Sequence, residues 1–324
     1  MNQPIEQALA LLAAGELVAI PTETVYGLAA DAANPQAVAK IFAAKGRPSD
    51  HPLIVHIAGS AQIDDWAIDV PQAARDLAAA FWPGPLTLIL KRQPHVPDAV
   101  TGGQDTVGLR APAHPLTHEL LVRFGGGLAA PSANKFGHVS PTTAEHVRQE
   151  FGAEVPLVLD GGPCLVGVES TIVSLVSDQP MLLRPGGVPR EAIEAVLGRP
   201  LEHHQKSDTA KIRASGLLDS HYAPRTKLIT GSLPQLVETA HRYYEQGQRA
   251  GLILFGESPA AIPAAIRVAM PTNPAAYARE LYATLRQLDT AGLDLLLLES
   301  PPNTPEWLAV NDRLMRAAHV RLPH

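Results

Sequence analysis

Two cations separated by a single glycine, Lys45 and Arg47, are the residues whose types and spacing most suggest chemistry. The helix-forming run 35–44 precedes them, with Asn34 as its expected N-cap and Pro35 in its first turn. Gly46 suits the left-handed end of a helix, and Pro48 forbids its continuation. Both side chains are therefore expected on a rigid break, where a fixed ammonium and guanidinium suit a phosphate-binding site. Alternatively, the cations only complement the helix dipole, and taken alone the segment favours this second interpretation.

Hydroxyl and amide side chains gather at three further turns, each beside the end of an expected strand or helix. They occur in residues 21–28, in Pro131-Ser132-Ala133-Asn134, and in Ser140-Pro141-Thr142, which precedes an expected helix over 142–150. Such turns and helix starts can bind an anion or let a ligand approach the backbone closely. They can equally satisfy only the local backbone as turns and caps, and from the residues both interpretations stay open.

Two more cations, Arg110 and Arg184, stand at the ends of expected strands over 106–110 and 181–184. No Ser-His-Asp order, paired carboxylates, nucleophilic cysteine or zinc-ligand spacing stands out. Fixed cations, hydroxyls and an amide bind and polarise an anionic substrate. ATP cleaved between its α and β phosphates would suit them, with Mg²⁺ neutralising the remaining charge. The residues alone lead to an enzyme that uses an anion or a nucleotide.

Composition indicates a folded protein of about two domains. The 324 residues are 46% hydrophobic and 18% charged, and the net charge is −6. Residues 1–200 hold 13 Lys and Arg against 20 Asp and Glu, so an anion site there must gather its few cations locally. No apolar run approaches the ~20 residues of a membrane span, and the start does not look like a signal peptide. With Cys164 as the only cysteine, we expect a protein of the reducing cytoplasm.

Two fold types are expected along the chain. Residues 1–200 combine helices with many short strands, which predicts an α+β domain with a mixed, twisted sheet. Residues 201–225 lack an apolar period and are predicted to be a linker, with Tyr222 near its end. Residues 226–324 alternate near-continuous apolar strands with helices, which predicts a small Rossmann-like α/β domain with a parallel sheet. This second domain carries neither a dinucleotide fingerprint nor a Walker-type loop.

Five motifs in order resemble a known family. They are Pro21-Thr22-Glu23-Thr24-Val25-Tyr26-Gly27-Leu28, Lys45-Gly46-Arg47-Pro48 with Pro52-Leu53-Ile54-Val55-His56, Pro83-Gly84-Pro85-Leu86-Thr87, Pro131-Ser132-Ala133-Asn134 and Glu169-Ser170-Thr171-Ile172-Val173. Together they look like the YrdC-like domain of threonylcarbamoyl-AMP synthases, and the tail resembles the C-terminal domain of the two-domain type. The resemblance implies that L-threonine, bicarbonate and ATP give threonylcarbamoyl-AMP and pyrophosphate. Threonylcarbamoyl transferase proteins would then modify the adenosine beside the anticodon of tRNA.

The resemblance also implies roles for individual residues. A threonine site would be lined by Thr24, His56, Arg110, Ala130 and Ser170, with Arg110 pairing the carboxylate. ATP would contact Arg47, His51, Thr106, Ser132, Ser140, Arg184 and Tyr222. Catalytic roles would fall to Lys45, Arg47 and Asn134, and Mg²⁺ would come with ATP rather than occupy a protein-only metal site. The family often carries Asn where this chain has His51.

Two alternatives compete with this interpretation. The first is a non-enzymatic RNA-binding module, which the acidic balance of residues 1–200 disfavours. A weak tRNA contact is compatible with either interpretation. The second is a carbamoyltransferase, because YrdC-like domains also occur in larger carbamoylating enzymes. Those enzymes carry additional catalytic or zinc modules, for which this chain has neither the length nor the cysteines.

Overall fold

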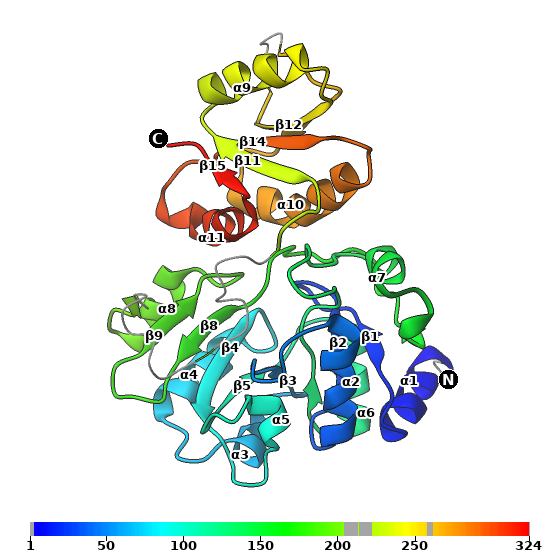
Figure 1. The fold of residues 1–324 in the computed structure, drawn as a ribbon. Coiled ribbons are helices and arrows are strands. Elements are labelled where there is room, and N and C mark those ends of the chain that lie inside the picture. The colour runs from blue at the N-terminus through cyan, green and yellow to red at the C-terminus, as the bar shows by residue number, and fades with distance from the viewer. Residues whose placement is uncertain (1–2, 204–212, 214–221, 258–261, 324) are drawn as a thin grey trace. The chain divides into compact units, whose positions relative to one another are not determined.

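The computed structural model describes residues 3–203, 213, 222–257 and 262–323. The chain divides into two compact units, coloured along the chain in Figure 1. Unit 1 comprises Met1–Phe136 and Pro141–Leu217, and unit 2 comprises Gly137–Ser140 and Leu218–His324. Each unit is described below by itself.

Unit 1 is built on a mixed sheet, as predicted. Its order is β10-β9-β8-β4-β5-β3-β6-β2-β1-β7, with both parallel pairs, such as β3 with β5, and antiparallel pairs, such as β4 with β5. The strands are short: β1 (Val18–Ile20), β2 (Gly27–Asp31), β3 (Ile54–His56), β4 (Leu86–Lys91), β5 (Thr106–Arg110), β6 (Leu128–Ala129), β7 (Leu157–Val158), β8 (Thr171–Ser174), β9 (Met181–Arg184) and β10 (Glu202–His203).

Helices of unit 1 pack on this sheet and on one another. The apolar faces of α1 and α6 meet over β1 and β2 in one core cluster that includes Ile5, Leu12 and Leu120. The described helices and 3₁₀ turns are α1 (Gln3–Ala13), α2 (Pro35–Lys45), η1 (Ser60–Gln62), α3 (Ile63–Trp66), α4 (Gln72–Phe81), α5 (Asp98–Thr101), α6 (Pro115–Phe124), α7 (Ala144–Phe151), η2 (Gly152–Glu154) and α8 (Arg190–Leu197).

The predicted caps of helix α2 are confirmed. Asn34 Oδ1 accepts hydrogen bonds from the backbone N–H groups of the first turn, and Pro35 opens the helix. Gly46 follows with φ 61°, the left-handed conformation that glycine adopts without a Cβ penalty. Lys45 is therefore the last residue of a capped helix that packs against β2.

Unit 2 contains the predicted parallel sheet, in the order β13-β12-β14-β11-β15. Helix α9 covers one face and α10 and α11 lie on the other (Figure 1). The bounds are β11 (Lys227–Gly231), α9 (Leu233–Glu245), β12 (Ala250–Phe255), β13 (Ile266–Met270), α10 (Pro274–Asp289), β14 (Leu295–Glu299), η4 (Pro305–Trp307), α11 (Leu308–Ala317) and β15 (Val320–Arg321).

Several details differ from the expectation. The 3₁₀ turn η4 precedes the final helix, which becomes α-helical only at Leu308. Strand β2 was not predicted, and its first two residues, Gly27 and Leu28, were assigned to the turn over 21–28. Glu202 and His203, expected in the linker, pair with β9. A linker over 201–225 stays a prediction, because most of that range lies outside the described residues. Within the described residues, no helix has the length and apolarity needed to span a membrane.

A substitution at Gly127 tests how tightly the chain is packed where β6 begins beside β3. A Cβ at this position would lie 2.6 Å from Val55 Cγ1 and closer still to the Trp66 ring. We expect Gly127→Ala to lower the free energy of unfolding by about 1–3 kcal/mol, because a packed core resists an added methyl group. Gly59→Ala is the control, since its backbone is extended and nothing lies within 4 Å of the added Cβ. Urea denaturation of both variants measures the difference, and equal stabilities would contradict the packing argument.

Candidate active site

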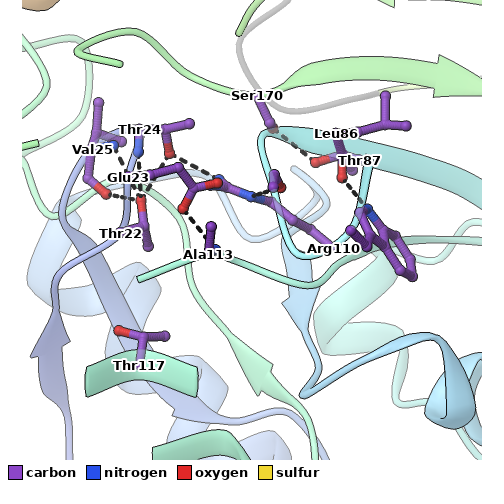
Figure 2. A network of polar contacts seen from close by, with 12 residues as sticks. Thr22, Glu23, Thr24, Val25, Leu86, Thr87, Arg110, Ala113, Thr117 and Ser170 are labelled. Atoms are coloured by element: carbon purple, nitrogen blue, oxygen red, sulfur yellow. Dashed lines mark hydrogen bonds and ion pairs between the residues drawn. The ribbon is translucent and has the colours of Figure 1, made fainter. Parts of the chain in front are cut away.

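A buried ion pair between Arg110 and Glu23 joins the end of β5 to the turn before β2 (Figure 2). Arg110 Nη2 donates to Glu23 Oε1 at 2.5 Å, and the two side chains are only 5% and 8% exposed. Arg110 Nη1 donates to Thr24 Oγ1 at 2.9 Å, and Nε donates to the carbonyl of Gly84 at 3.3 Å. Three chain segments thus converge on one guanidinium.

The turn that carries Glu23 and Thr24 is fixed by its own hydroxyl groups. Thr22 Oγ1 donates to the carbonyl of Val25 at 2.6 Å and lies 2.8 Å from Thr24 Oγ1. The carbonyls of Glu23 and Thr24 accept hydrogen bonds from the backbone N–H groups of Val166 and Gly167 at 2.7 and 3.2 Å. The loop before β8 therefore holds this turn from a second side.

His56 lies beside Arg110 because β3 and β5 are parallel neighbours in which these two residues are in register. Burial of the imidazole, and secondarily the positive charge of Arg110, lower the pKa of His56 from 6.5 to about 3. His56 Nδ1 lies 3.3 Å from the carbonyl of Ile54. A neutral imidazole therefore faces this part of the site at ordinary pH.

Ser170, Thr87 and Arg184 form a second buried polar cluster. Thr87 Oγ1 and Ser170 Oγ are 2.8 Å apart. A dashed line marks this contact in Figure 2. Arg184 Nη2 donates to Ser170 Oγ at 3.1 Å and to the carbonyl of Ser170 at 2.9 Å. Gly186 passes so close to residues 169–171 that a Cβ there would meet their backbone. The end of β9 is thereby fixed against the start of β8.

Lys45 joins helix α2 to the Ser132–Asn134 loop. Its Nζ donates to the carbonyl of Ser132 at 2.5 Å and to the carbonyl of Asn134. Burial, and secondarily the nearby charge of Arg47, lower the pKa of Lys45 well below its usual value. The amine is therefore held by backbone dipoles rather than by a carboxylate.

Arg47 and His51 lie after α2, on the way to β3. Arg47 Nη2 donates to the carbonyl of Pro52 at 3.0 Å. The His51 ring meets the Phe136 ring edge-on, with centroids 5.7 Å apart. Partial burial, and then Arg47, lower the pKa of His51, so its ring is held neutral beside the arginine.

The structure thus brings most residues of the predicted site into three groups. In the first, Arg110 directly contacts Thr24 and is in register with His56, and in the second, Ser170 contacts Arg184. The third group comprises Lys45, Ser132 and Asn134, together with Arg47 and His51. Ala130 directly follows β6, and its backbone N–H donates to the carbonyl of Ile54 at 3.0 Å.

Thr106 does not lie beside Arg110. It opens β5, where it pairs with Lys91, whereas Arg110 ends the same strand. Four residues of extended strand separate their backbones by about 13 Å. An ATP contact by Thr106 would therefore involve a different part of the ligand from one near Arg110.

Ser140 and Tyr222 belong to unit 2 and are described with it. The Tyr222 ring stacks on Tyr282 at 5.8 Å, and the guanidinium of Arg313 lies 5.2 Å from its centre. The backbone of Tyr222 also has φ 67°, a conformation that residues other than glycine rarely adopt. Arg286 of α10 donates to the carbonyls of Val139 and Ser140 at 2.5 and 3.3 Å. Unit 2 thus holds two segments that the predictions assign to ATP.

Two residues of the site were not among the predicted site residues. Glu23 is the ion-pair partner of Arg110, and Thr87 is the hydroxyl partner of Ser170. Both lie within the motifs already noted, and Glu23 is the one carboxylate in the turn 21–28. Its position between Thr22 and Thr24 was the feature of the sequence that could have identified it as a site residue. Across the described part of the chain, no group of three or more His, Cys, Asp or Glu residues could hold a metal ion.

Both parts of the chain match models of known protein families. A family model described as "Telomere recombination" matches residues 10–186, and one described as "Threonylcarbamoyl-AMP synthase, C-terminal domain" matches residues 188–319. The threonylcarbamoyl-AMP synthase of Bacillus subtilis (strain 168) is 45% identical over 331 residues, covering 99% of this chain and 95% of that protein. The enzyme of the same name from Pyrococcus abyssi (strain GE5 / Orsay) is 40% identical, covering 98% and 95%.

A solved structure is also similar over nearly the whole chain. The crystal structure of P. abyssi Sua5 complexed with L-threonine superposes with a TM-score of 0.91 at 38% identity. The match covers 98% of this chain and 96% of that one.

His56 makes stability depend on pH. Between pH 6.5 and 3 the unfolded chain binds a proton at this imidazole that the folded chain excludes. The free energy of unfolding should therefore fall with falling pH, by up to about 1.4 kcal/mol per pH unit from this group. We expect His56→Gln to flatten the dependence between pH 6 and 4 in urea denaturation. His118→Gln, on the exposed face of α6, is the control for replacing a histidine. A wild-type slope in His56→Gln would contradict the assignment.

Proposed function

The chain belongs to the threonylcarbamoyl-AMP synthase family, and from that premise we propose that it makes threonylcarbamoyl-AMP and pyrophosphate from L-threonine, bicarbonate and ATP. The observation that carries this proposal is the match of both domains over the full chain. The site adds chemical support, since it presents buried cations and hydroxyls. Such groups bind and polarise anionic substrates.

Threonine recognition is proposed around Arg110. The guanidinium has five N–H donors, of which three make the described hydrogen bonds, so two are left for a substrate carboxylate. Thr24, His56, Ala130 and Ser170 would line the rest of this subsite. A neutral His56 suits it, because a second cation would repel the substrate's ammonium group.

ATP recognition is proposed around Lys45 and Arg47, together with residues outside their group. Contacts to ATP are assigned to Arg47, His51, Thr106, Ser132, Ser140, Arg184 and Tyr222. Lys45 and Asn134, with Arg47, would orient the phosphates or the carbamate. A bound phosphate would favour the charged form of Lys45, because an opposite charge within about 4–6 Å raises the pKa of an amine.

The reaction then needs no nucleophile from the protein. After the ammonium group of threonine has lost a proton to solvent, its nitrogen attacks the bicarbonate carbon and water leaves. A carbamate oxygen then attacks the α-phosphorus of ATP as pyrophosphate departs. The proposed contributions of the site are to align these groups and to stabilise the developing phosphate charge. Mg²⁺ is proposed to arrive with ATP as part of that substrate.

Downstream steps are also part of the proposal. The mixed anhydride is reactive, so a threonylcarbamoyl transferase protein would have to accept it for modification of tRNA. We also propose that this chain is located in the cytoplasm and that it makes a weak contact with tRNA.

Pyrophosphate release tests the proposed reaction. With Mg–ATP present, L-threonine and bicarbonate are each supplied or omitted. We expect release that needs both, because the carbamate forms only from the two together. Release that is indifferent to threonine, or no release at all, would overturn the proposal, and salt-dependent tRNA binding without turnover would favour an RNA-binding module.

Arginine variants test the two proposed subsites. Arg110→Lys should raise the KM for L-threonine about tenfold or more, because an ammonium cannot reproduce the planar guanidinium fork. Arg47→Gln should instead raise the KM for ATP. Arg75→Gln is the control, as its guanidinium is 44% exposed and pairs with Asp64 on the surface. Steady-state kinetics with each substrate varied separates the two patterns, and the same pattern in both variants would contradict the assignment.

A further inference from the structure

Hydrogen bonds hold both the side chain and the backbone of Glu23. Its Oε1 accepts from Arg110 Nη2 at 2.5 Å, and its Oε2 accepts from the backbone N–H of Ala113 at 3.0 Å. Its own carbonyl accepts from the backbone N–H of Val166 at 2.7 Å. Both carboxylate oxygens therefore have a donor, and the side chain is fixed with respect to the end of β5 (Figure 2).

The contacts of Glu23 fix the plane of the Arg110 guanidinium. A planar fork that is bound at Nη2 by Glu23, at Nη1 by Thr24 and at Nε by the carbonyl of Gly84 has one orientation. The two N–H groups that make none of these bonds, one on each Nη atom, consequently point in set directions. Without the Glu23 carboxylate, the strongest of the three anchors is lost.

The hydroxyl hydrogen bonds beside Arg110 have one direction, which the Thr22 hydroxyl sets. The Thr22 hydroxyl donates its single hydrogen to the carbonyl of Val25. Thr24 must therefore be the donor in the 2.8 Å contact between the Thr22 and Thr24 hydroxyls. Arg110 can only donate, so Thr24 Oγ1 accepts from it. The hydrogen of the Thr24 hydroxyl is thus committed, and the group can offer a ligand only its oxygen as an acceptor.

We propose that Glu23 is a positioning residue for the amino-acid substrate, acting through Arg110, an inference that rests on the proposed function. Glu23 aims the remaining Arg110 donors at the substrate carboxylate. The Thr24 oxygen, which already accepts from Arg110, has one acceptor site left for an N–H or O–H group of the same substrate. Recognition of the substrate carboxylate therefore depends on one buried carboxylate that itself touches no reacting atom.

A competing role for Glu23 makes the opposite prediction. Its carboxylate could occupy the position on Arg110 that the substrate carboxylate needs, as an internal competitor. Neutralising Glu23 would then strengthen threonine binding. If Glu23 positions Arg110, neutralising it weakens binding.

Glu23→Gln separates these roles with little change of shape. Glutamine has one acceptor oxygen where Glu23 uses two, so it can serve Arg110 or the Ala113 N–H but not both. Glu23→Asp keeps the charge and shortens the reach. Glu16→Gln is the matched control, because Glu16 forms a surface pair with Lys40 in which both side chains are 43% exposed.

The experiment measures affinities of the full chain for L-threonine and L-threoninamide by calorimetry. Threoninamide lacks the carboxylate, so the ratio of the two affinities reports how well Arg110 is aimed. In Glu23→Gln we expect threonine affinity to fall about tenfold or more and the ratio to fall with it, with Glu23→Asp intermediate. A merely structural role would weaken both ligands equally and leave the ratio unchanged.

The outcomes distinguish this inference from the proposed function. An unchanged ratio in Glu23→Gln, or tighter threonine binding, overturns the positioning role. Wild-type protein that binds threonine but releases no threonine-dependent pyrophosphate overturns the proposed function, while the affinity ratio still decides the role of Glu23. Wild-type protein that binds no threonine overturns both.

Discussion

The candidate site depends on one buried ion pair, that of Arg110 with Glu23. Neither charge would be tolerated alone in the interior, because removing one partner leaves the other desolvated and uncompensated. Each therefore requires the other, and the chain segments that carry them must meet. The pair need not add net stability to the fold, since desolvation offsets much of the attraction. Its effect is geometric: it fixes the turn before β2 against the end of β5.

Three other cations of the site donate hydrogen bonds to backbone carbonyls. Lys45 donates to the carbonyls of Ser132 and Asn134, Arg47 to that of Pro52, and Arg184 to that of Ser170. A carbonyl fixes a cation's position without cancelling its charge as a carboxylate would. A chain with a net charge of −6 can in this way present local positive charge to an anionic substrate.

The C-terminal unit includes a short segment that is distant in sequence from the rest of it. Gly137–Ser140 belongs to it, and Arg286 of α10 binds the carbonyls of Val139 and Ser140. Tyr222, stacked on Tyr282 beside Arg313, lies in the same unit. Because residues 137–140 are continuous in the chain with Phe136 and Pro141, the loop after Asn134 is tied to this unit by covalent bonds.

Features that depend only on neighbouring residues could be predicted from the sequence. Asn34, Gly46 and Pro48 predicted the limits of α2, because caps act within one helical turn. The continuous apolar strands predicted the parallel sheet of unit 2, and the ordered motifs indicated the family. Which side chains of the site contact one another follows from the tertiary structure alone. Glu23 and Arg110 are 87 positions apart, and Lys45 is 89 positions from Asn134. Strands of two or three residues, such as β6, likewise exist only through their partners. Such contacts follow from sheet register and burial, which no local window of sequence encodes.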